Sequence, residues 1–306
     1  MENNCYFVSS RGLLKSCTFH SLNPISSSNK DNRHLYNMLH SNKMFNGMSI
    51  YVCSDLLKYF VKFILPKLLH TFVLVSGDSD LCVPKEALTK EETIRLLQSK
   101  LLIKWYTQNS RVEENDKIIQ IPIGLDYHTI FKNPNCNWKL PDEGHLPKQQ
   151  EDILINIIKN TIPFHERIPK IYVNYTVNND RFNQRQSALN TIPSELMEIN
   201  TAFTPRTQTW KNMSQYSFIL SPAGIGLDCH RTWEALCLGC IPIVCISEFK
   251  TLFNELPVLI VNNWNEITKE LLENTIECFK NKHFNKNKLT LNYWVTKINV
   301  IKNNIR

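Results

Sequence analysis

The residues of this chain that are best suited to chemistry lie where an apolar run meets a glycine-containing loop and a helix. Residues 216–220 have the composition of a buried strand, and the loop at 221–226 contains Gly224 and Gly226. Glycine lets a backbone approach a ligand closely, and the N–H groups at the start of the next helix favour an anion. Open α/β sheets bind nucleotides at such turns. The alternative is a tight strand-to-helix turn without a ligand.

The helix expected at 228–238 carries a charged face. Arg231 and Glu234 are three residues apart and therefore share one side, with His230 beside them. Charges between apolar strands are costly unless they point at a ligand or partner, so this face suits a binding site. The alternative is a surface ion pair of little energetic value. Gly239 is expected to end the helix as its C′ residue.

Residues 221–244 read Ser-Pro-Ala-Gly-Ile-Gly-Leu-Asp-Cys-His-Arg-Thr-Trp-Glu-Ala-Leu-Cys-Leu-Gly-Cys-Ile-Pro-Ile-Val. This segment resembles the signature of the exostosin-like glycosyltransferases, and the similarity continues through 256–261, 264–267 and 291–294. The resemblance implies a GT-B-like α/β fold, with two Rossmann-type doubly wound domains and a cleft between them. It implies transfer of a sugar from a nucleotide-diphosphate donor to a glycan or glycoprotein acceptor.

The resemblance also assigns roles to the donor-binding residues. Glu234 would accept hydrogen bonds from the donor ribose, while Arg231 and the amides of residues 224–226 would hold the diphosphate. Ser221 and His230 would complete the donor site.

Two positions bear on the branch of the family and on its cations. Gly226 stands where retaining relatives carry a second glutamate, which favours the inverting branch. Ala223 stands where the family usually has arginine, so the expected phosphate site lacks one cation. Arg181 or Arg185 is expected to replace it, with Lys211 a weaker candidate; the alternative for the two arginines is a solvated helix face.

An inverting transferase needs a base for the acceptor hydroxyl and positive charge for the departing diphosphate. The base is expected among Asp78, Asp80, Asp126 and His128, which follow expected strands. Asp78 and Asp80 also have the spacing of a metal motif, and both suit ordinary turn chemistry. The resemblance implies that a helix dipole and basic side chains replace a metal, so we expect no cofactor and no required metal.

Alternating strands and helices predict the α/β layering that would position these residues. Strands are expected at 71–76, 117–123, 170–176, 216–220, 240–246 and 258–261. Helices are expected at 54–69, 90–102, 152–160, 181–189, 210–215, 228–238, 265–279 and 288–301. Thr89 and Glu92 predict a capping box at the start of the second helix.

The length of 306 residues suggests two domains. We expect an acceptor-side domain at 1–160 and a nucleotide-sugar-binding domain at 161–285. The segment 286–306 is expected to form a helix that crosses back to the first domain.

The net charge of +7 suits either nucleic acid or small anionic ligands. Because the basic residues are spread along the chain, we expect no nucleic-acid partner. The most apolar stretch, 56–75, is interrupted by lysines and Pro66, which argues against a membrane span.

The ten cysteines show no disulfide framework, and Cys237 and Cys240 suit reduced, buried thiols better than a redox or metal site. With no signal-like start, these thiols predict a cytoplasmic protein. The richness in Asn and Lys suggests a microbe or a large DNA virus, in which case the protein would lie in host cytoplasm or in the virion.

Two further hypotheses remain open at this point. One is a degenerate transferase fold that binds nucleotide or glycan without turnover, which the alanine at 223 favours. The other is a different enzyme on a doubly wound fold, such as a sugar-nucleotide epimerase.

Overall fold

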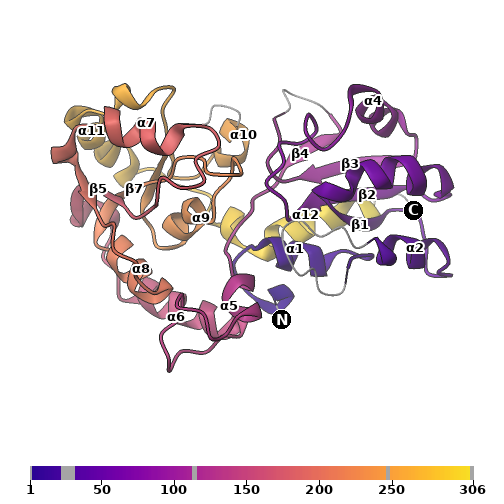
Figure 1. Cartoon of the computed structure of the whole chain (residues 1–306), viewed down its shortest axis with the longest axis horizontal. Coiled ribbons are helices and arrows are strands. Elements are labelled where there is room, and N and C mark those ends of the chain that lie inside the picture. Colours follow the sequence, from indigo (N-terminus) through magenta and orange to yellow (C-terminus); the bar gives the residue numbers. More distant parts are fainter. Residues whose placement is uncertain (1, 22–31, 112–115, 246–248, 304–306) are drawn as a thin grey trace. The chain divides into compact units, whose positions relative to one another are not determined.

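The computed structural model describes residues 2–21, 32–111, 116–245 and 249–303. The chain is a mixed α/β protein with two parallel sheets, which confirms the expected α/β layering (Figure 1). It divides into two compact units. Unit 1 consists of residues 1–7 and 124–289, and unit 2 consists of residues 8–123 and 290–306. Residue 246 of an expected strand and residues 304–306 of the expected C-terminal segment lie outside the described residues.

Unit 2 contains a four-stranded parallel sheet whose strand order follows the sequence. Its strands are β1 (Met48–Cys53), β2 (Phe72–Gly77), β3 (Leu102–Thr107) and β4 (Ile118–Gln120). Every residue of β1 and β2 is buried, as expected for parallel strands that are covered on both faces. Because the order is sequential, these four strands contain no point at which the direction of the crossovers reverses.

The helices of unit 2 include the one at which the sequence predicts a capping box. The helical segments are α1 (Ser10–Ser16), α2 (Arg33–Leu39), η2 (Ser54–Leu56), α3 (Leu57–Tyr59), η3 (Phe60–Ile64), η4 (Leu65–Lys67), α4 (Lys90–Gln98) and α12 (Leu291–Asn303). The predicted capping box is confirmed, since Thr89 and Glu92 exchange hydrogen bonds of 3.2 and 2.9 Å at the start of α4.

The prediction that this helix reaches residue 102 was wrong. Helix α4 ends at Gln98, and Leu102 begins strand β3. The strand contains Ile103, Trp105 and Tyr106, and side chains of these types fit a pleated, half-buried surface better than a helix. The indole N–H of Trp105 donates to the hydroxyl of Ser76 on β2 at 2.8 Å, so its polar atom is satisfied within the core.

Unit 1 contains a five-stranded parallel sheet with the order β6-β5-β7-β8-β9. Its strands are β5 (Ile168–Val173), β6 (Met197–Ile199), β7 (Tyr216–Leu220), β8 (Ile241–Val244) and β9 (Leu259–Ile260). Numbered within the unit, this is the doubly wound order 2-1-3-4-5. The chain leaves β5 in one direction and β7 in the other, and doubly wound sheets bind their ligands at the carboxyl ends of two such strands.

Helices and short helical turns connect the strands of unit 1. They are η1 (Glu2–Asn4), α5 (His128–Lys132), α6 (Pro147–Lys159), η5 (Phe164–Glu166), α7 (Gln184–Thr191), η6 (Ser194–Leu196), α8 (Arg206–Met213), α9 (His230–Cys237), α10 (Lys250–Phe253), η8 (Trp264–Glu266), α11 (Lys269–Lys280) and η9 (Lys286–Leu289). Gly239 follows α9 with a φ of 74°, which confirms its predicted role at the helix end.

The two cysteines around this helix end are buried, free thiols. Arg167 packs beside them and donates hydrogen bonds to the carbonyl of Leu238 at 2.9 Å and to the sulfur of Cys240 at 3.1 Å. Burial raises the pKa of the Cys240 thiol to about 11, although the charge of Arg167 acts in the opposite direction. Burial also raises the pKa of Cys237 well above its ordinary value. Both thiols therefore stay protonated and unreactive at neutral pH.

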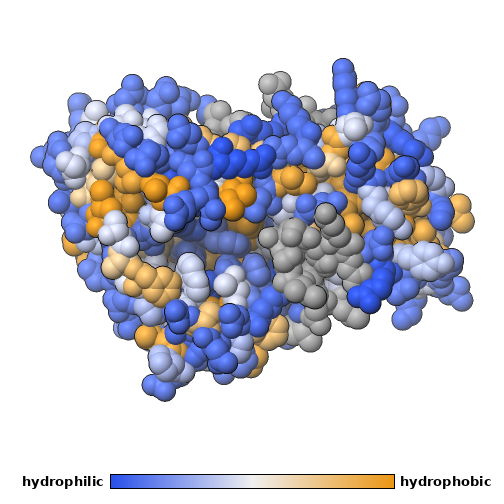
Figure 2. Space-filling view, viewed as in Figure 1, coloured by the Kyte–Doolittle hydropathy of each residue, from blue (hydrophilic) through white to orange (hydrophobic). Residues whose placement is uncertain are grey.

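Hydrophilic residues cover most of the face seen in Figure 2, with apolar residues in scattered groups between them. In the part of the chain that the structure describes, none of the helices is both long and apolar enough to cross a bilayer.

Candidate functional site

The point at which the crossovers of unit 1 reverse is bordered by two loops, one after β5 and one after β7. The first loop runs from residue 174 into α7, and the second runs from residue 221 into α9. Parallel strands direct these loops to the same edge of the sheet, and the reversal of the crossovers keeps them from covering each other. Side chains from both loops therefore meet at this edge.

Arg231, the second residue of α9, reaches across to the loop after β5. Its Nε donates a hydrogen bond of 3.0 Å to the side-chain oxygen of Asn174. Its guanidinium carbon lies 5.2 Å from the centre of the Tyr175 ring, within the range of a cation–π contact. Its Nη1 is buried and has no hydrogen-bond partner among the described residues. Burial, together with the charge of Arg185, lowers the pKa of Arg231.

Arg185, from the first turn of α7, approaches the same aromatic ring. Its guanidinium carbon lies 5.7 Å from the centre of the Tyr175 ring, and its Nη1 donates to the carbonyls of Thr176 and Asn178 at 3.1 Å each. A Cβ added to Gly224 would lie 2.3 Å from Nη2 of Arg185. The missing side chain of Gly224 therefore lets this guanidinium rest directly against the loop after β7.

Neither of these two guanidinium groups forms an ion pair with a carboxylate among the residues that the structure describes. Two positive charges thus converge on Tyr175, and none of the described carboxylates lies at ion-pair distance from either of them. Like charges held close together repel, and a bound anion would remove the repulsion from both. The arrangement favours an anionic ligand with more than one oxygen atom.

Several polar groups of the loop after β7 bond to other parts of unit 1. The hydroxyl of Ser221 is buried and lies 2.8 Å from that of Thr232. The N–H of Ala223 donates to the side-chain oxygen of Gln184 at 3.0 Å, and the side-chain amide of Gln184 donates to Cys245 at 2.9 Å. These bonds fix the loop in place, and the contact between Ser221 and Thr232 joins the loop to α9.

Glu234 lies one turn along α9 from Arg231. Its side chain is half-buried, and no hydrogen bond or ion pair joins its carboxylate to another described residue. Asp228 is the other carboxylate near the start of this helix, and the indole N–H of Trp233 lies 2.9 Å from both of its oxygens. Glu234 is therefore the carboxylate of α9 that is available to a ligand.

A second polar group in unit 1 contains the expected residues Asp126 and His128. One carboxylate oxygen of Asp126 lies 3.0 Å from Nδ1 of His128 and accepts the N–H of Thr129 at 3.0 Å. The other oxygen lies 2.9 Å from Nη2 of Arg206, which also donates from Nη1 to the backbone carbonyl of Asp126. Burial alone would favour the protonated acid. The charges of Arg206, His128 and His230 overcome that effect and hold the pKa of Asp126 well below its usual range.

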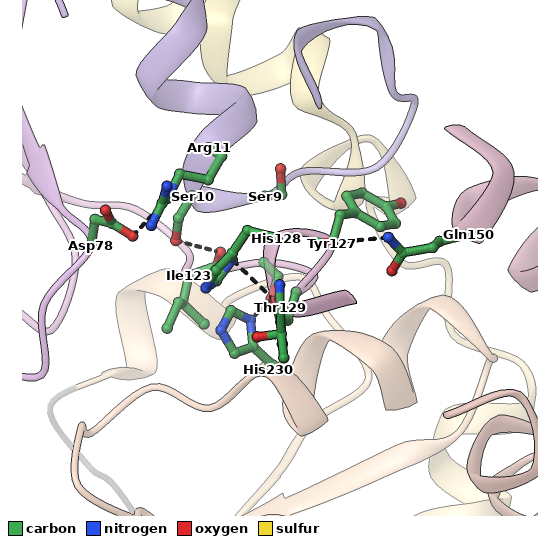
Figure 3. A network of polar contacts seen from close by, with 12 residues as sticks. Ser9, Ser10, Arg11, Asp78, Ile123, Tyr127, His128, Thr129, Gln150 and His230 are labelled. Atoms are coloured by element: carbon green, nitrogen blue, oxygen red, sulfur yellow. Dashed lines mark hydrogen bonds and ion pairs between the residues drawn. The ribbon is translucent and has the colours of Figure 1, made fainter. Parts of the chain in front are cut away.

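His230 links this polar group to Arg231, its neighbour in the chain. Its Nδ1 lies 2.7 Å from the carbonyl oxygen of Gly124, and its ring centre lies 6.1 Å from that of His128. Figure 3 shows the two imidazole rings next to each other. His128 therefore lies near the start of α9, the helix that carries Arg231.

Asp78 and Asp80 lie in unit 2, after strand β2. Asp78 forms an ion pair with Nε of Arg11 at 3.0 Å, and the two side chains are only 2 % and 4 % exposed (Figure 3). Its N–H is bound by the side chain of Gln108 at 2.9 Å. Asp78 is thus part of a buried network, while Asp80 is half-buried beside it. Within the described ranges, no group of three or more His, Cys, Asp or Glu side chains is placed to hold a metal ion.

Arg181 and Arg185 were interchangeable as sequence candidates, and the structure separates them. Helix α7 begins at Gln184 rather than at residue 181, because the carboxylate of Asp180 accepts the N–H groups of Gln184 and Gln186 at 2.8 and 2.9 Å. Arg181 precedes the helix, is exposed, and stacks on Phe182 at 5.3 Å. Lys211 is exposed on α8.

Sequence reasoning missed four residues that shape the site, namely Asn174, Tyr175, Gln184 and Arg206. The first three follow strand β5, and their position beside a crossover reversal could have indicated them. Nothing in the sequence places Arg206 next to Asp126, eighty residues away. Comparison of the chain with protein-family models finds no match, and comparison with curated proteins finds none either.

Proposed function

We propose that this protein is a glycosyltransferase that uses a nucleotide-diphosphate sugar and binds the diphosphate between Arg185 and Arg231. The observation that carries the proposal is the convergence of these two guanidinium groups on Tyr175, at the crossover reversal of a doubly wound sheet. Guanidinium groups offer paired N–H donors that match phosphate oxygens, and such sheets bind nucleotides at this point.

In this proposal Arg185 supplies the cation that the exostosin-like signature would carry at residue 223. Its guanidinium rests against Gly224, the next residue along the loop. Arg181 is a poorer substitute because it is exposed and lies before the helix. The alanine at 223 is then compatible with an intact phosphate site.

In this proposal the carboxylate of Glu234 accepts hydrogen bonds from the ribose hydroxyls of the donor. The diphosphate repels a nearby carboxylate. Glu234 can therefore favour donor binding only by accepting hydrogen bonds from neutral hydroxyl groups. The proposal also includes a GT-B architecture, an inverting reaction without a required metal, and a glycan or glycoprotein acceptor. These parts rest on the resemblance of residues 221–244 to the exostosin-like enzymes.

Donor binding is tested by the shift in melting temperature with UDP, GDP, dTDP and their common sugar conjugates, because a ligand that binds only the folded state stabilises it. We expect one nucleotide series to stabilise the wild type, and Arg231→Gln to remove that shift. Glu234→Gln should weaken the binding of nucleoside diphosphates but should not change the binding of inorganic pyrophosphate, which lacks a ribose.

Release of nucleoside diphosphate from the sugar conjugate that binds then tests turnover. Binding without any release would indicate the degenerate transferase fold. If none of the nucleotides stabilises the wild type, or if Arg231→Gln responds as the wild type does, the proposed site is wrong.

A further inference from the structure

The cluster of polar side chains around Asp126 contains two imidazoles that could transfer a proton. Asp126, His128, Arg206 and His230 all belong to unit 1, as does the arginine pair. Their relation to the proposed diphosphate site therefore depends on unit 1 alone. His230 and Arg231 are the first two residues of α9, and the ring centre of His128 lies 6.1 Å from that of His230, so His128 lies near the helix start at which the diphosphate is proposed to bind.

The hydrogen bonds determine which nitrogen of each imidazole carries the proton. A carbonyl oxygen only accepts, so Nδ1 of His230 donates to Gly124 at 2.7 Å. The carboxylate of Asp126 is held ionised by its neighbours, so Nδ1 of His128 donates to it at 3.0 Å. In a neutral imidazole the remaining nitrogen, Nε2, then carries the lone pair. Asp126 thus fixes the tautomer of His128 that accepts a proton at Nε2.

We propose that His128 is the general base that deprotonates the acceptor hydroxyl, and that Asp126 and Arg206 position it. This inference rests on the proposed function. As the acceptor oxygen forms its bond to the anomeric carbon, Nε2 of His128 takes the hydroxyl proton. The bond from the anomeric carbon to the phosphate oxygen breaks, and its electron pair leaves with the diphosphate. The proton on His128 is later released to solvent, which restores the neutral imidazole.

Two features of the structure favour His128 over the other candidates. Its side chain is 19 % exposed, so a substrate can reach the ring, whereas Asp78 is enclosed by Arg11. Asp126 uses both carboxylate oxygens for His128, Thr129 and Arg206, so it acts through the imidazole. Among the described residues, Asp126 on its own segment and His230 from α9 face His128, and Arg206 from α8 pairs with the other oxygen of Asp126.

Asp126 also accepts the N–H of Thr129 in the first turn of α5, so it has a structural role that the test must separate. Asn caps a helix about as well as Asp does. Asp126→Asn therefore keeps the cap, while it removes the charge that orients the Nδ1 proton. A loss of activity in a folded Asp126→Asn variant then reports on His128 rather than on the helix.

The experiment measures release of nucleoside diphosphate from whichever of UDP-glucose, UDP-N-acetylglucosamine, GDP-mannose or dTDP-glucose binds the wild type, with water as acceptor. We expect His128→Gln to lower the rate by roughly 10²- to 10⁴-fold, the usual contribution of a general base. Its nucleotide affinity, from the melting-temperature shift, should stay as in the wild type. The matched control is His165→Gln, which removes a partly exposed imidazole from η5 of the same unit.

The pH–rate profile and chemical rescue complete the test. The wild-type rate should fall at acid pH, because a protonated base cannot accept a proton, and His128→Gln should lack this fall. In Asp126→Asn the acid fall should move to lower pH, since the negative charge beside the imidazolium is gone. Added imidazole should restore part of the rate of His128→Gly. A His128→Gln rate within threefold of wild type would overturn the inference while leaving the proposed function intact. A wild type that binds none of these donors would contradict both.

Discussion

The contact between Gly224 and Arg185 allows the proposed phosphate site to be disrupted without touching either arginine. In Gly224→Ala the new Cβ would lie 2.3 Å from Nη2 and 3.0 Å from Cζ of Arg185, both too close for real atoms. The obstacle is the far end of a flexible side chain, so the guanidinium moves rather than the fold. The backbone at Gly224 is not in the left-handed region, and alanine is compatible with it.

The displaced guanidinium loses its two hydrogen bonds to the carbonyls of Thr176 and Asn178 and leaves the ring of Tyr175. It would also no longer donate to the diphosphate in the proposed site, and a hydrogen bond to a charged group is worth about 1.5–3 kcal/mol. We therefore expect Gly224→Ala to weaken nucleoside diphosphate binding by roughly 10- to 150-fold, since each 1.4 kcal/mol is a factor of ten. Arg185→Ala should have the same effect.

Titration calorimetry with UDP, GDP or dTDP measures these affinities, and the double variant provides the decisive comparison. If Gly224→Ala acts through Arg185, the double variant binds no more weakly than either single variant, because the same interaction is lost only once. Arg181→Ala is the control for net charge, because it removes an exposed cation that stacks on Phe182. Additive losses in the double variant, or an unchanged affinity in Gly224→Ala, would refute the assignment of Arg185 to the phosphate site.

Three further variants test other parts of the structure. Asp78→Ala leaves the guanidinium of Arg11 buried without its carboxylate, so urea unfolding should show a loss of about 3–5 kcal/mol, with nucleotide affinity retained; a stable variant without turnover would instead restore Asp78 as a catalytic candidate. The pKa of Asp126 is depressed in the folded state, so its contribution to stability is present above its unfolded pKa of about 3.9 and is lost as pH falls further. The stability gap between wild type and Asp126→Asn should therefore be constant near neutral pH and narrow below about pH 4; a gap that widens there would show that the sign is wrong. Trp233→Phe removes the indole N–H that donates to the buried carboxylate of Asp228 and should cost about 1–3 kcal/mol in thermal or urea unfolding, whereas an unchanged stability would mean that this bond contributes nothing.

Local patterns in the sequence predicted the elements around the site well. The strand expected at 216–220 is β7, residue for residue, because its apolar run has no competing helical period. The glycine loop and the helix that carries Arg231 and Glu234 follow it as expected, with α9 shorter by two residues at its start. These features depend on residues close together in the chain, and such residues are what a single sequence reports.

The rest of the site depends on strand order, which no local pattern encodes. Strand β6 has only three residues, Met197–Ile199, and was not predicted, yet its pairing with β5 creates the crossover reversal. Without that reversal Asn174 and Tyr175 have no reason to meet Arg231. The contact between Asp126 and Arg206 joins residues eighty positions apart, and no local pattern encodes it either. Sequence reasoning therefore found the charged residues but not the neighbours that orient them.

The division of the chain has a consequence for the order in which the protein forms during synthesis. Neither unit is one continuous stretch, since residues 1–7 belong with 124–289, and residues 290–306 belong with 8–123. The N–H groups of Tyr6 and Phe7 bond to the buried carboxylate of Glu151, 145 and 144 residues away, and the hydroxyl of Tyr106 bonds to the carbonyl of Lys297, 191 residues away.

Residues 8–123 of unit 2 therefore emerge before residues 124–289 of unit 1, and residues 290–306 of unit 2 follow only after them. The edge of unit 2 that receives α12 has to wait while all of unit 1 emerges from the ribosome. Contacts of such long separation also slow folding, because the loop has to close before they contribute. Residues 8–123 thus wait for part of their own unit during synthesis, and incompletely formed units of this kind expose apolar surface that promotes aggregation.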